Sequence, residues 1–307
     1  MALACAVDEK LMESPAMSSA VPDNTAVVSA AQGHGGLRRA RVLSIAGSDS
    51  GGGAGIQADI KAITALGGYA MTALTALTAQ NTLGVQGILP VPPEFVRQQI
   101  RSVRDDIGID AIKTGMLGGA AEIHAVADEV ATIRHQTPGL PIVVDPVMVA
   151  KGGAVLLQAD ALESLVRELL PLATVMTPNL PEAMQLVGRE LVTLADMKEA
   201  ARTLRERTGA AVLLKGGHMQ GETIVDILLD DSGLTEFPGL RLPGRHTHGT
   251  GCTLASALAT RLGQGFSLIE ATDQARRYVQ AAIAHAPGFG QGAGPLWHAH
   301  GWHGGVA

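Results

Sequence analysis

The sequence predicts one α/β domain, in which helices cover both faces of a mostly parallel central sheet. Three observations lead to this fold class. Short apolar runs alternate with amphipathic stretches from about residue 41 onward, as in parallel strands joined by helical crossovers. The runs are apolar throughout, as expected of strands buried on both faces. Glycine and polar residues follow most of the runs, where ligands bind in sheets of this kind.

The predicted strands are mostly apolar runs of three to seven residues, each followed by turn or polar residues. The first is Val42–Ala46, which stops at Gly47. The others are Met71–Leu77, Ala111–Thr114, Ile142–Val144, Thr174–Thr177, Ala211–Leu214 and Ile224–Leu229. Because crossovers between parallel strands are right-handed and connections are short, one doubly wound domain is the simplest packing.

The predicted helices lie between most of these strands. The first shows apolar residues at Ile56, Ile60, Ile63 and Leu66, the spacing of one helix face, and Gly67 ends it. The others are Pro93–Val103, Ala120–Ile133, Asp160–Leu170, Leu194–Thr208 and Thr253–Leu262.

The two ends of the chain differ in composition from the domain between them. Residues 1–40 are rich in Ala, Ser, Pro and Gly with weak periodicity, which predicts a flexible N-terminal extension. The domain is expected over 41–290. Residues 291–307 turn to Gly, His and Trp and are expected to form a loosely docked tail. His298, His300 and His303 could bind a metal there, although a simple tail is the favoured interpretation.

Composition narrows the possible functions. Of 307 residues, 46% are apolar and 17% charged, as in globular proteins. The net charge of −6 argues against a nucleic-acid partner, whereas backbone amides could still hold a small anion. The cysteines are Cys5 and Cys252, so we do not expect a structural disulfide. We expect the protein to be located in the reducing cytoplasm. The sequence shows neither a secretory leader nor a membrane span.

The segment Thr247–Cys252, with Gly249 and Gly251, precedes the last predicted helix. Two glycines before a helix start allow successive amides to point into one concavity, where the helix dipole favours negative charge. Such donors suit phosphoryl transfer. Cys252 beside them is expected to have a lowered pKa and to accept a proton. The alternative is a glycine-rich helix cap with an inert buried cysteine.

A second glycine-rich segment, Gly47–Gly55, follows the first strand. It is neither a Walker A loop, since no Gly-Lys-Ser/Thr follows, nor a dinucleotide fingerprint, since Ile56 stands where a third glycine is needed. Backbone without Cβ atoms suits the approach of a planar ring. Asp59, one turn into the following helix, could accept hydrogen bonds from such a ligand, or could be a first-turn acid that favours the helix dipole.

Polar residues after two later strands could serve a nucleotide and its metal. Asn179 and Glu182 have the spacing of a helix capping box, and they could also hold water around Mg²⁺. Lys215 directly follows an apolar strand and precedes Gly216. Its charge could neutralise nucleotide phosphates, although a charged residue in this position is usually exposed or paired.

Together these segments resemble the hydroxymethylpyrimidine/phosphomethylpyrimidine kinases of thiamine biosynthesis, within the ribokinase-like superfamily. The resemblance covers most of the chain from about Val42. It rests on segments 45–59 (IAGSDSGGGAGIQAD), 78–82 (TAQNT), 113–117 (KTGML), 145–148 (DPVM), 177–182 (TPNLPE), 215–218 (KGGH) and 248–252 (HGTGC). The resemblance implies a ribokinase-like fold and two successive transfers from MgATP, first to the hydroxymethylpyrimidine hydroxyl and then to the monophosphate.

The resemblance also implies roles for individual residues. Asp59 and Gln80 would bind the pyrimidine. The residues expected to pack around it are Gly47, Ala54, Met116 and Val147. Cys252 would be the base, with Gly249 and Gly251 as the anion hole. The residues expected to contact the nucleotide are Lys215, Thr247 and Thr250. The residues expected to organise Mg²⁺ are Asp145, Asn179 and Glu182.

Cys252 favours the pyrimidine branch, because sugar kinases and many pyridoxal kinases carry aspartate at this position. Some family members with this cysteine also phosphorylate pyridoxal, which is the first alternative. A non-catalytic pyrimidine- or pyridoxal-binding protein on the same fold is the second, although simple binding needs neither Cys252 nor Lys215. The chain departs from the family at Gln291, where Gly-His-Gly is usual. We also expect a homodimer.

Overall fold

The computed structural model describes residues 38–149, 153, 156–157, 160–219 and 221–302. Residues 1–37 of the expected N-terminal extension, and His303 of the expected tail, lie outside the described residues. Among the helices that are described, none combines the length and apolar character needed to cross a bilayer.

Nine strands form a single sheet in the order β3-β2-β1-β4-β5-β6-β7-β8-β9. The strands are β1 (Arg41–Asp49), β2 (Tyr69–Asn81), β3 (Gly84–Pro90), β4 (Ala111–Thr114), β5 (Ile142–Val144), β6 (Val175–Met176), β7 (Ala211–Leu214), β8 (Thr223–Asp230) and β9 (Gly233–Leu240). The pairs from β2 through β7 are parallel, and the pairs β2–β3, β7–β8 and β8–β9 are antiparallel. The predicted α/β fold with a mostly parallel sheet is confirmed.

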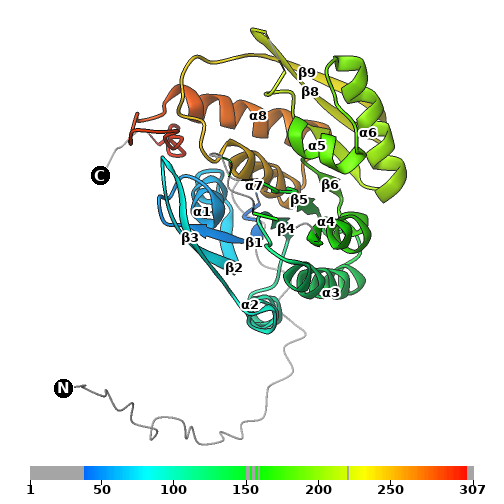
Figure 1. Cartoon of the computed structure of the whole chain (residues 1–307). Coiled ribbons are helices and arrows are strands. Elements are labelled where there is room, and N and C mark those ends of the chain that lie inside the picture. The colour runs from blue at the N-terminus through cyan, green and yellow to red at the C-terminus, as the bar shows by residue number, and fades with distance from the viewer. Residues whose placement is uncertain (1–37, 150–152, 154–155, 158–159, 220, 303–307) are drawn as a thin grey trace, which may run out of the picture. The chain divides into compact units, whose positions relative to one another are not determined.

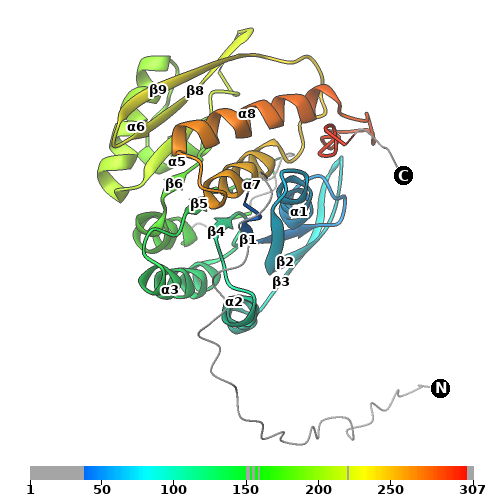
Figure 2. The same cartoon turned by 180° about the vertical axis from the view of Figure 1, so that it is seen from behind.

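Helices pack on both faces of the sheet (Figures 1 and 2). The helices are α1 (Gly55–Ala65), α2 (Pro93–Asp106), α3 (Ala120–Gln136), α4 (Ala161–Ser164), α5 (Leu180–Val187), α6 (Leu194–Thr208), α7 (Thr250–Gly263) and α8 (Leu268–Ala284). One apolar core contains buried residues of α2 to α6, and a second contains those of α1, α7 and α8. The sheet therefore separates two cores.

The strands alternate between these cores, which explains why their sequences are apolar throughout. In β7, Ala211 and Leu213 belong to the core beneath α7 and α8, whereas Val212 and Leu214 belong to the other. Successive side chains of a strand point to opposite faces. Since both faces are covered, neither set can be polar at low cost.

The elements β3, β9 and α8 were not predicted, and α5 was predicted only through its capping box. Both strands lie at the edges of the sheet, where one backbone edge faces away from the sheet and glycine or proline is tolerated. Gly87 and Pro90 in β3 and Pro238 in β9 therefore conceal strands whose sequences lack an apolar run. The helix predicted over Asp160–Leu170 is shorter than expected, because α4 passes into a π-helical turn at Leu165–Leu169 and a 3₁₀ turn at Leu170–Leu172. Pro171 restricts continuation of the α-helix there.

Residues 291–302 of the expected tail are described, and they pack onto the domain more closely than a loosely docked tail would. Leu296 and His298 are buried. His298 Nε2 lies 2.9 Å from Thr253 Oγ1 of α7, and the hydroxyl of Tyr278 donates to the His298 carbonyl at 2.8 Å. The apolar and small residues of this segment fill space beside α7 and α8, which composition alone does not reveal.

A buried polar cluster joins α1 and α7 to the sheet. Lys113 of β4 and Asp59 of α1 are fully buried, and their Nζ and Oδ2 atoms are 2.8 Å apart. The hydroxyls of Ser44 and Ser256 donate to the two Asp59 oxygens at 2.6 Å. Lys113 lies within β4 and faces α1. Its pKa is raised, because the nearby Asp59 carboxylate outweighs the lowering effect of burial.

Replacing Lys113 should destabilise the fold strongly. We expect Lys113→Met to lower the free energy of unfolding by about 3–5 kcal/mol, because the Asp59 carboxylate stays buried without a counter-charge. Urea denaturation followed by circular dichroism measures this change. The double variant Lys113→Met/Asp59→Leu serves as the control and should recover part of the loss. A single variant within about 1 kcal/mol of the wild type would contradict a structural role for the pair.

Candidate active site

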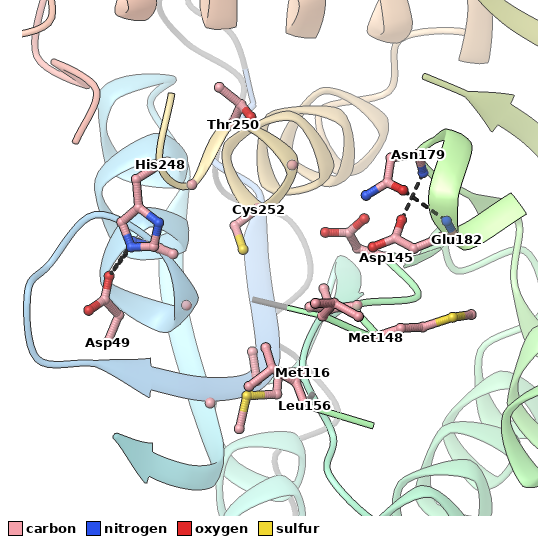
Figure 3. A pocket seen from close by; sticks show the side chains of 18 of the residues that line it. Asp49, Met116, Asp145, Met148, Leu156, Asn179, Glu182, His248, Thr250 and Cys252 are labelled. Carbon is pink, nitrogen blue, oxygen red and sulfur yellow. Dashed lines mark hydrogen bonds and ion pairs between the residues drawn. The ribbon is translucent and has the colours of Figure 1, made fainter. Parts of the chain in front are cut away.

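One cavity of about 390 Å³ lies at the carboxyl ends of the parallel strands, where ligands bind in sheets of this kind. The ends of β1 and β2 and the loop after β1 form one side. Residues after β4, β5, β6 and β7 form the rest, together with the first turn of α7. The volume falls within the range of small-molecule sites. Figure 3 shows the interior, with Cys252 near its middle.

The cavity brings together almost every residue that the sequence analysis assigned to a site. Those that line it are Gly47, Ala54, Gln80, Met116, Asp145, Val147, Asn179, Glu182, Lys215, Thr247, Gly249, Thr250, Gly251 and Cys252. Asp59 is the exception, because it does not line the cavity. Its carboxylate is fully buried and bound to Lys113, Ser44 and Ser256. Asp59 therefore supports the cavity from behind instead of lining it.

The two glycine-rich segments pack against each other through their backbones. Gly249 has φ +82°, and a Cβ atom there would lie 1.8 Å from the carbonyl oxygen of Gly53. Gly55 has φ +54°, and a Cβ atom there would lie 2.3 Å from the carbonyl oxygen of Gly47. Glycine is therefore needed at both positions, for conformation and for space. This contact places the turn before α7 directly beside the loop after β1.

The first turn of α7 supplies backbone donors to the cavity. The helix begins at Thr250, three residues before the predicted start, and Gly249 caps it without a side-chain hydrogen bond. The first N–H groups of a helix lack partners within the helix, and its dipole favours anions there. A Cβ atom on Gly251 would lie 3.3 Å from Lys215 Nζ. Backbone donors and an ammonium group therefore lie close together, as a phosphate would require.

The thiol of Cys252 does not have the lowered pKa that was predicted. Burial raises it to about 11, although the charge of Lys113 and a backbone hydrogen bond from Gly55 act in the opposite direction. In the ligand-free protein Cys252 is therefore a thiol at neutral pH. The helix dipole alone does not compensate for the loss of water around a thiolate.

Asp145 and Lys215 form an ion pair at the ends of β5 and β7. Lys215 Nζ donates to Asp145 Oδ1 at 2.9 Å, and Thr177 Oγ1 donates to the same oxygen at 2.9 Å. Burial lowers the pKa of Lys215, but the charges of Asp145 and Glu182 raise it by more. The pKa therefore lies above its ordinary value, and the ammonium group is charged. The single cation that was predicted for nucleotide phosphates is thus held in place by a carboxylate.

Asn179 and Glu182 form the predicted capping box of α5. Asn179 Oδ1 accepts from the Glu182 amide at 2.9 Å, and Glu182 Oε2 accepts from the Asn179 amide at 2.7 Å. Burial raises the pKa of Glu182 to about 7, and Asp145 contributes in the same direction while Lys215 opposes it. The cap also turns both side chains toward Asp145 (Figure 3).

The oxygen donors of Asp145, Asn179 and Glu182 suit Mg²⁺, which prefers carboxylate and amide oxygens and retains several waters. Among the described residues, no cluster of three or more His, Cys, Asp or Glu side chains could hold a metal alone. The residues fit a magnesium ion that is shared with phosphate and water, and they do not form an all-protein cage.

Two cavity residues without an assigned role in the sequence analysis are Asp49 and His248. His248 Nε2 lies 2.9 Å from Asp49 Oδ2 and 3.1 Å from Gln80 Nε2. Both residues fall within the glycine-rich segments, and His248 directly precedes the predicted anion hole. An acid and a histidine next to glycine-rich turns could have indicated that both residues belong to the site. Their distance in sequence concealed the pairing.

Comparison with known proteins gives consistent results. A family model described as phosphomethylpyrimidine kinase matches residues 49–297. The hydroxymethylpyrimidine/phosphomethylpyrimidine kinase of Rhizobium meliloti is 47% identical over 265 residues, covering 85% of this chain and 97% of that protein. The corresponding Streptomyces coelicolor protein is 49% identical over 261 residues, with coverage of 85% and 94%. The chain also matches the thiamine biosynthesis bifunctional protein ThiED of Geobacter sulfurreducens at 51% identity, and spans 52% of its length.

Solved structures show the same fold. The phosphomethylpyrimidine kinase of Clostridium difficile has a TM-score of 0.70 at 38% identity, over 80% of this chain and 100% of that one. An ADP complex of Bacillus subtilis pyridoxal kinase has a TM-score of 0.77 at 36% identity, over 86% and 98%. The expected ribokinase-like fold is confirmed.

The raised pKa of Cys252 predicts slow alkylation. We expect the rate of its reaction with iodoacetamide in the ligand-free protein to keep rising with pH toward about 11, because the thiolate is the reacting form. An ordinary cysteine would level off near pH 9. Mass spectrometry of a Cys5→Ser variant isolates Cys252. A rate that reaches its plateau below pH 8 would show that the thiol is activated before ligands bind.

Proposed function

We propose a specific function for this chain, which belongs to the phosphomethylpyrimidine kinase family. It transfers the γ-phosphoryl group of ATP to the hydroxyl of 4-amino-5-hydroxymethyl-2-methylpyrimidine. It then phosphorylates the monophosphate to the diphosphate, which supplies the pyrimidine half of thiamine. The observation that carries this proposal is the meeting of Lys215, the first turn of α7 and Gln80 in one cavity.

The cavity divides into a side for the acceptor and a side for the phosphates. Gly47, Gln80 and Met116 lie on the side formed by β1, β2 and β4, where a planar ring would bind. Lys215 and the amides of Gly251 and Cys252 lie on the other side, where the phosphates of the nucleotide would bind. Phosphoryl transfer depends mainly on positioning and on stabilisation of charge. The hydroxyl oxygen of the acceptor bonds to the γ-phosphorus as the bond from that phosphorus to the leaving ADP oxygen breaks.

The proton of the acceptor hydroxyl goes to Cys252 in this proposal. With a pKa of about 11, only about one thiol in 10⁴ is ionised at pH 7. The base role therefore requires that ligand binding favour the thiolate. Lys113 already acts in that direction. Aspartate, which sugar kinases carry at this position, would be ionised without such help.

Asp145, Asn179 and Glu182 would hold Mg²⁺, directly or through water. When bound, the ion supplies positive charge that neutralises phosphate oxygens. Lys215 keeps its charge through Asp145 and would contact the phosphates from the other direction. A cytoplasmic location and a homodimer, both expected from the sequence, remain predictions.

Pyridoxal is the second candidate acceptor. Structures of Staphylococcus aureus pyridoxal kinase, including one with AMP-PCP and pyridoxal, have TM-scores of 0.77 to 0.78 at 34% identity. The relatives at higher identity are named as pyrimidine kinases, so we propose pyridoxal as a secondary acceptor at most.

Competition among acceptors tests the proposed function. We expect kcat/KM for hydroxymethylpyrimidine to exceed that for pyridoxal by at least about tenfold, a ratio that differences in polar contacts can supply. The monophosphate should also be consumed. Coupled measurement of ADP release with each acceptor alone and in mixture gives the ratio. Binding of the pyrimidine without ADP release would instead identify a non-catalytic binding protein.

Cys252→Ala tests the base. We expect kcat to fall by about 10²-fold or more, within the range of general-base catalysis, while the affinity for the pyrimidine changes little. Steady-state kinetics and calorimetric titration measure the two quantities. Cys252→Ser, which keeps size and a weaker proton acceptor, is the matched control and should fall between. A near-normal kcat in the alanine variant would remove Cys252 from this role.

A further inference from the structure

His248 contacts two other cavity residues through one ring nitrogen. Nε2 lies 2.9 Å from Asp49 Oδ2 and 3.1 Å from Gln80 Nε2. The side chains of His248 and Asp49 are 12% and 3% exposed, so water competes little for these contacts. The three residues come from the turn before α7, the end of β1 and β2. Figure 3 shows the pair of His248 and Asp49 on one side of Cys252.

The carboxylate of Asp49 accepts hydrogen bonds from three backbone amides. Its Oδ2 accepts from the amides of Gly53 and Ala54 at 3.0 and 2.7 Å, and its Oδ1 accepts from Gly51 at 2.8 Å. Burial raises the pKa of Asp49, but the hydrogen bonds from His248 and the amides lower it by more. The pKa therefore lies below its ordinary value. The group is therefore a carboxylate. Its contact with His248 is a hydrogen bond only when Nε2 carries a proton and donates.

A protonated Nε2 constrains Gln80. A ring nitrogen that bears a proton has no free lone pair to accept one, so the Gln80 amide cannot donate to it. The carbonyl oxygen of Gln80 must face His248 instead. The oxygen and nitrogen of an amide exchange places by a half-turn of the group without changing its shape. This half-turn directs the N–H groups of Gln80 away from His248.

The backbone of Gln80 is held in place by two hydrogen bonds. Ser50 Oγ donates to the Gln80 carbonyl and accepts from the Gln80 amide, both at 2.8 Å. These bonds fix Gln80 to the glycine-rich loop that Asp49 also organises. With the backbone fixed, the Gln80 side chain meets the requirement of His248 by turning its amide.

We propose that Asp49 and His248 are positioning residues, which hold the Gln80 amide with its N–H donors toward the cavity. The site would thereby select a ring edge that accepts hydrogen bonds, such as an unprotonated heteroaromatic nitrogen. This inference rests on the proposed function, in that the ligand is the pyrimidine. It adds to that function a reason why two residues without expected ligand contact matter for specificity.

The first test observes the tautomer directly in the full-length wild-type protein. Two-bond ¹H–¹⁵N spectra of protein with ¹⁵N-labelled histidine report which ring nitrogen carries a proton, and a His248→Gln variant identifies the signal. We expect a proton on Nε2 of His248 at neutral pH. An unprotonated Nε2 with a proton on Nδ1 alone would overturn the proposal. This measurement does not depend on catalysis, so it is independent of whether the proposed function holds.

The second test uses kinetics with matched variants. We expect His248→Leu to raise KM for the pyrimidine about tenfold, the effect of losing one buried hydrogen-bonding arrangement. KM for ATP and kcat should change less than about threefold. His248→Gln should stay within about threefold of wild type for all three quantities, because its amide nitrogen carries two protons and can donate to both Asp49 and the Gln80 oxygen.

A double-mutant cycle separates positioning from a general structural effect. In a Gln80→Ala background, His248→Leu should change KM for the pyrimidine less than about twofold, since the two residues act through one contact. Additive effects, or an equal rise in KM for ATP, would overturn the proposal in favour of a displaced anion hole. If the wild type consumes no ATP with the pyrimidine, the proposed function fails while the spectroscopic result still stands.

Discussion

The buried ion pair of Asp59 and Lys113 is the interaction on which the rest of the structure depends. It joins α1 to β4, and Ser44 and Ser256 extend it to β1 and α7. Removing two charges from water is costly, and the pair stabilises the fold only while every lone pair and proton is satisfied. That requirement fixes the positions of α1 and α7 relative to the sheet. Since α7 begins at the anion hole and α1 follows the glycine-rich loop, the same pair fixes the geometry of the cavity.

The cavity is also held together from its rim. The backbones of the two glycine-rich segments touch at Gly53 and Gly249. On the far side of the turn, Thr253 donates to the Gly249 carbonyl at 2.7 Å and lies 2.9 Å from His298. Burial lowers the pKa of His298 to about 4, so the ring is neutral. The C-terminal segment therefore supports the anion hole without adding charge to it.

Sequence analysis predicted the buried parallel strands and most helices because burial on both faces requires continuous apolar runs. It missed β3 and β9, since edge strands do not need such runs. All but one of the site residues that it predicted line the cavity, because glycine and polar residues at strand ends share one edge of the sheet, whereas Asp49 and His248 were missed. The pairing of Asp59 with Lys113 was not foreseen, because an acid near a helix start has the same sequence pattern whether it meets a ligand or a lysine. The pKa of Cys252 depends on burial, which spacing does not show.

Charge balance explains how the site can bind a polyanion although the chain carries a net charge of −6. Among the residues that the structure describes, Lys113 and Lys215 lie near the anion hole, and they are paired with Asp59 and Asp145 respectively. Neither adds an uncompensated positive charge in the ligand-free protein. Glu182, with a pKa raised to about 7, adds further negative charge as the pH rises. The subsite around Lys215 is thus neutral or negative, which favours a divalent cation beside the carboxylates. The oxyanion donors of α7 are uncharged amides and remain available whichever way that balance shifts.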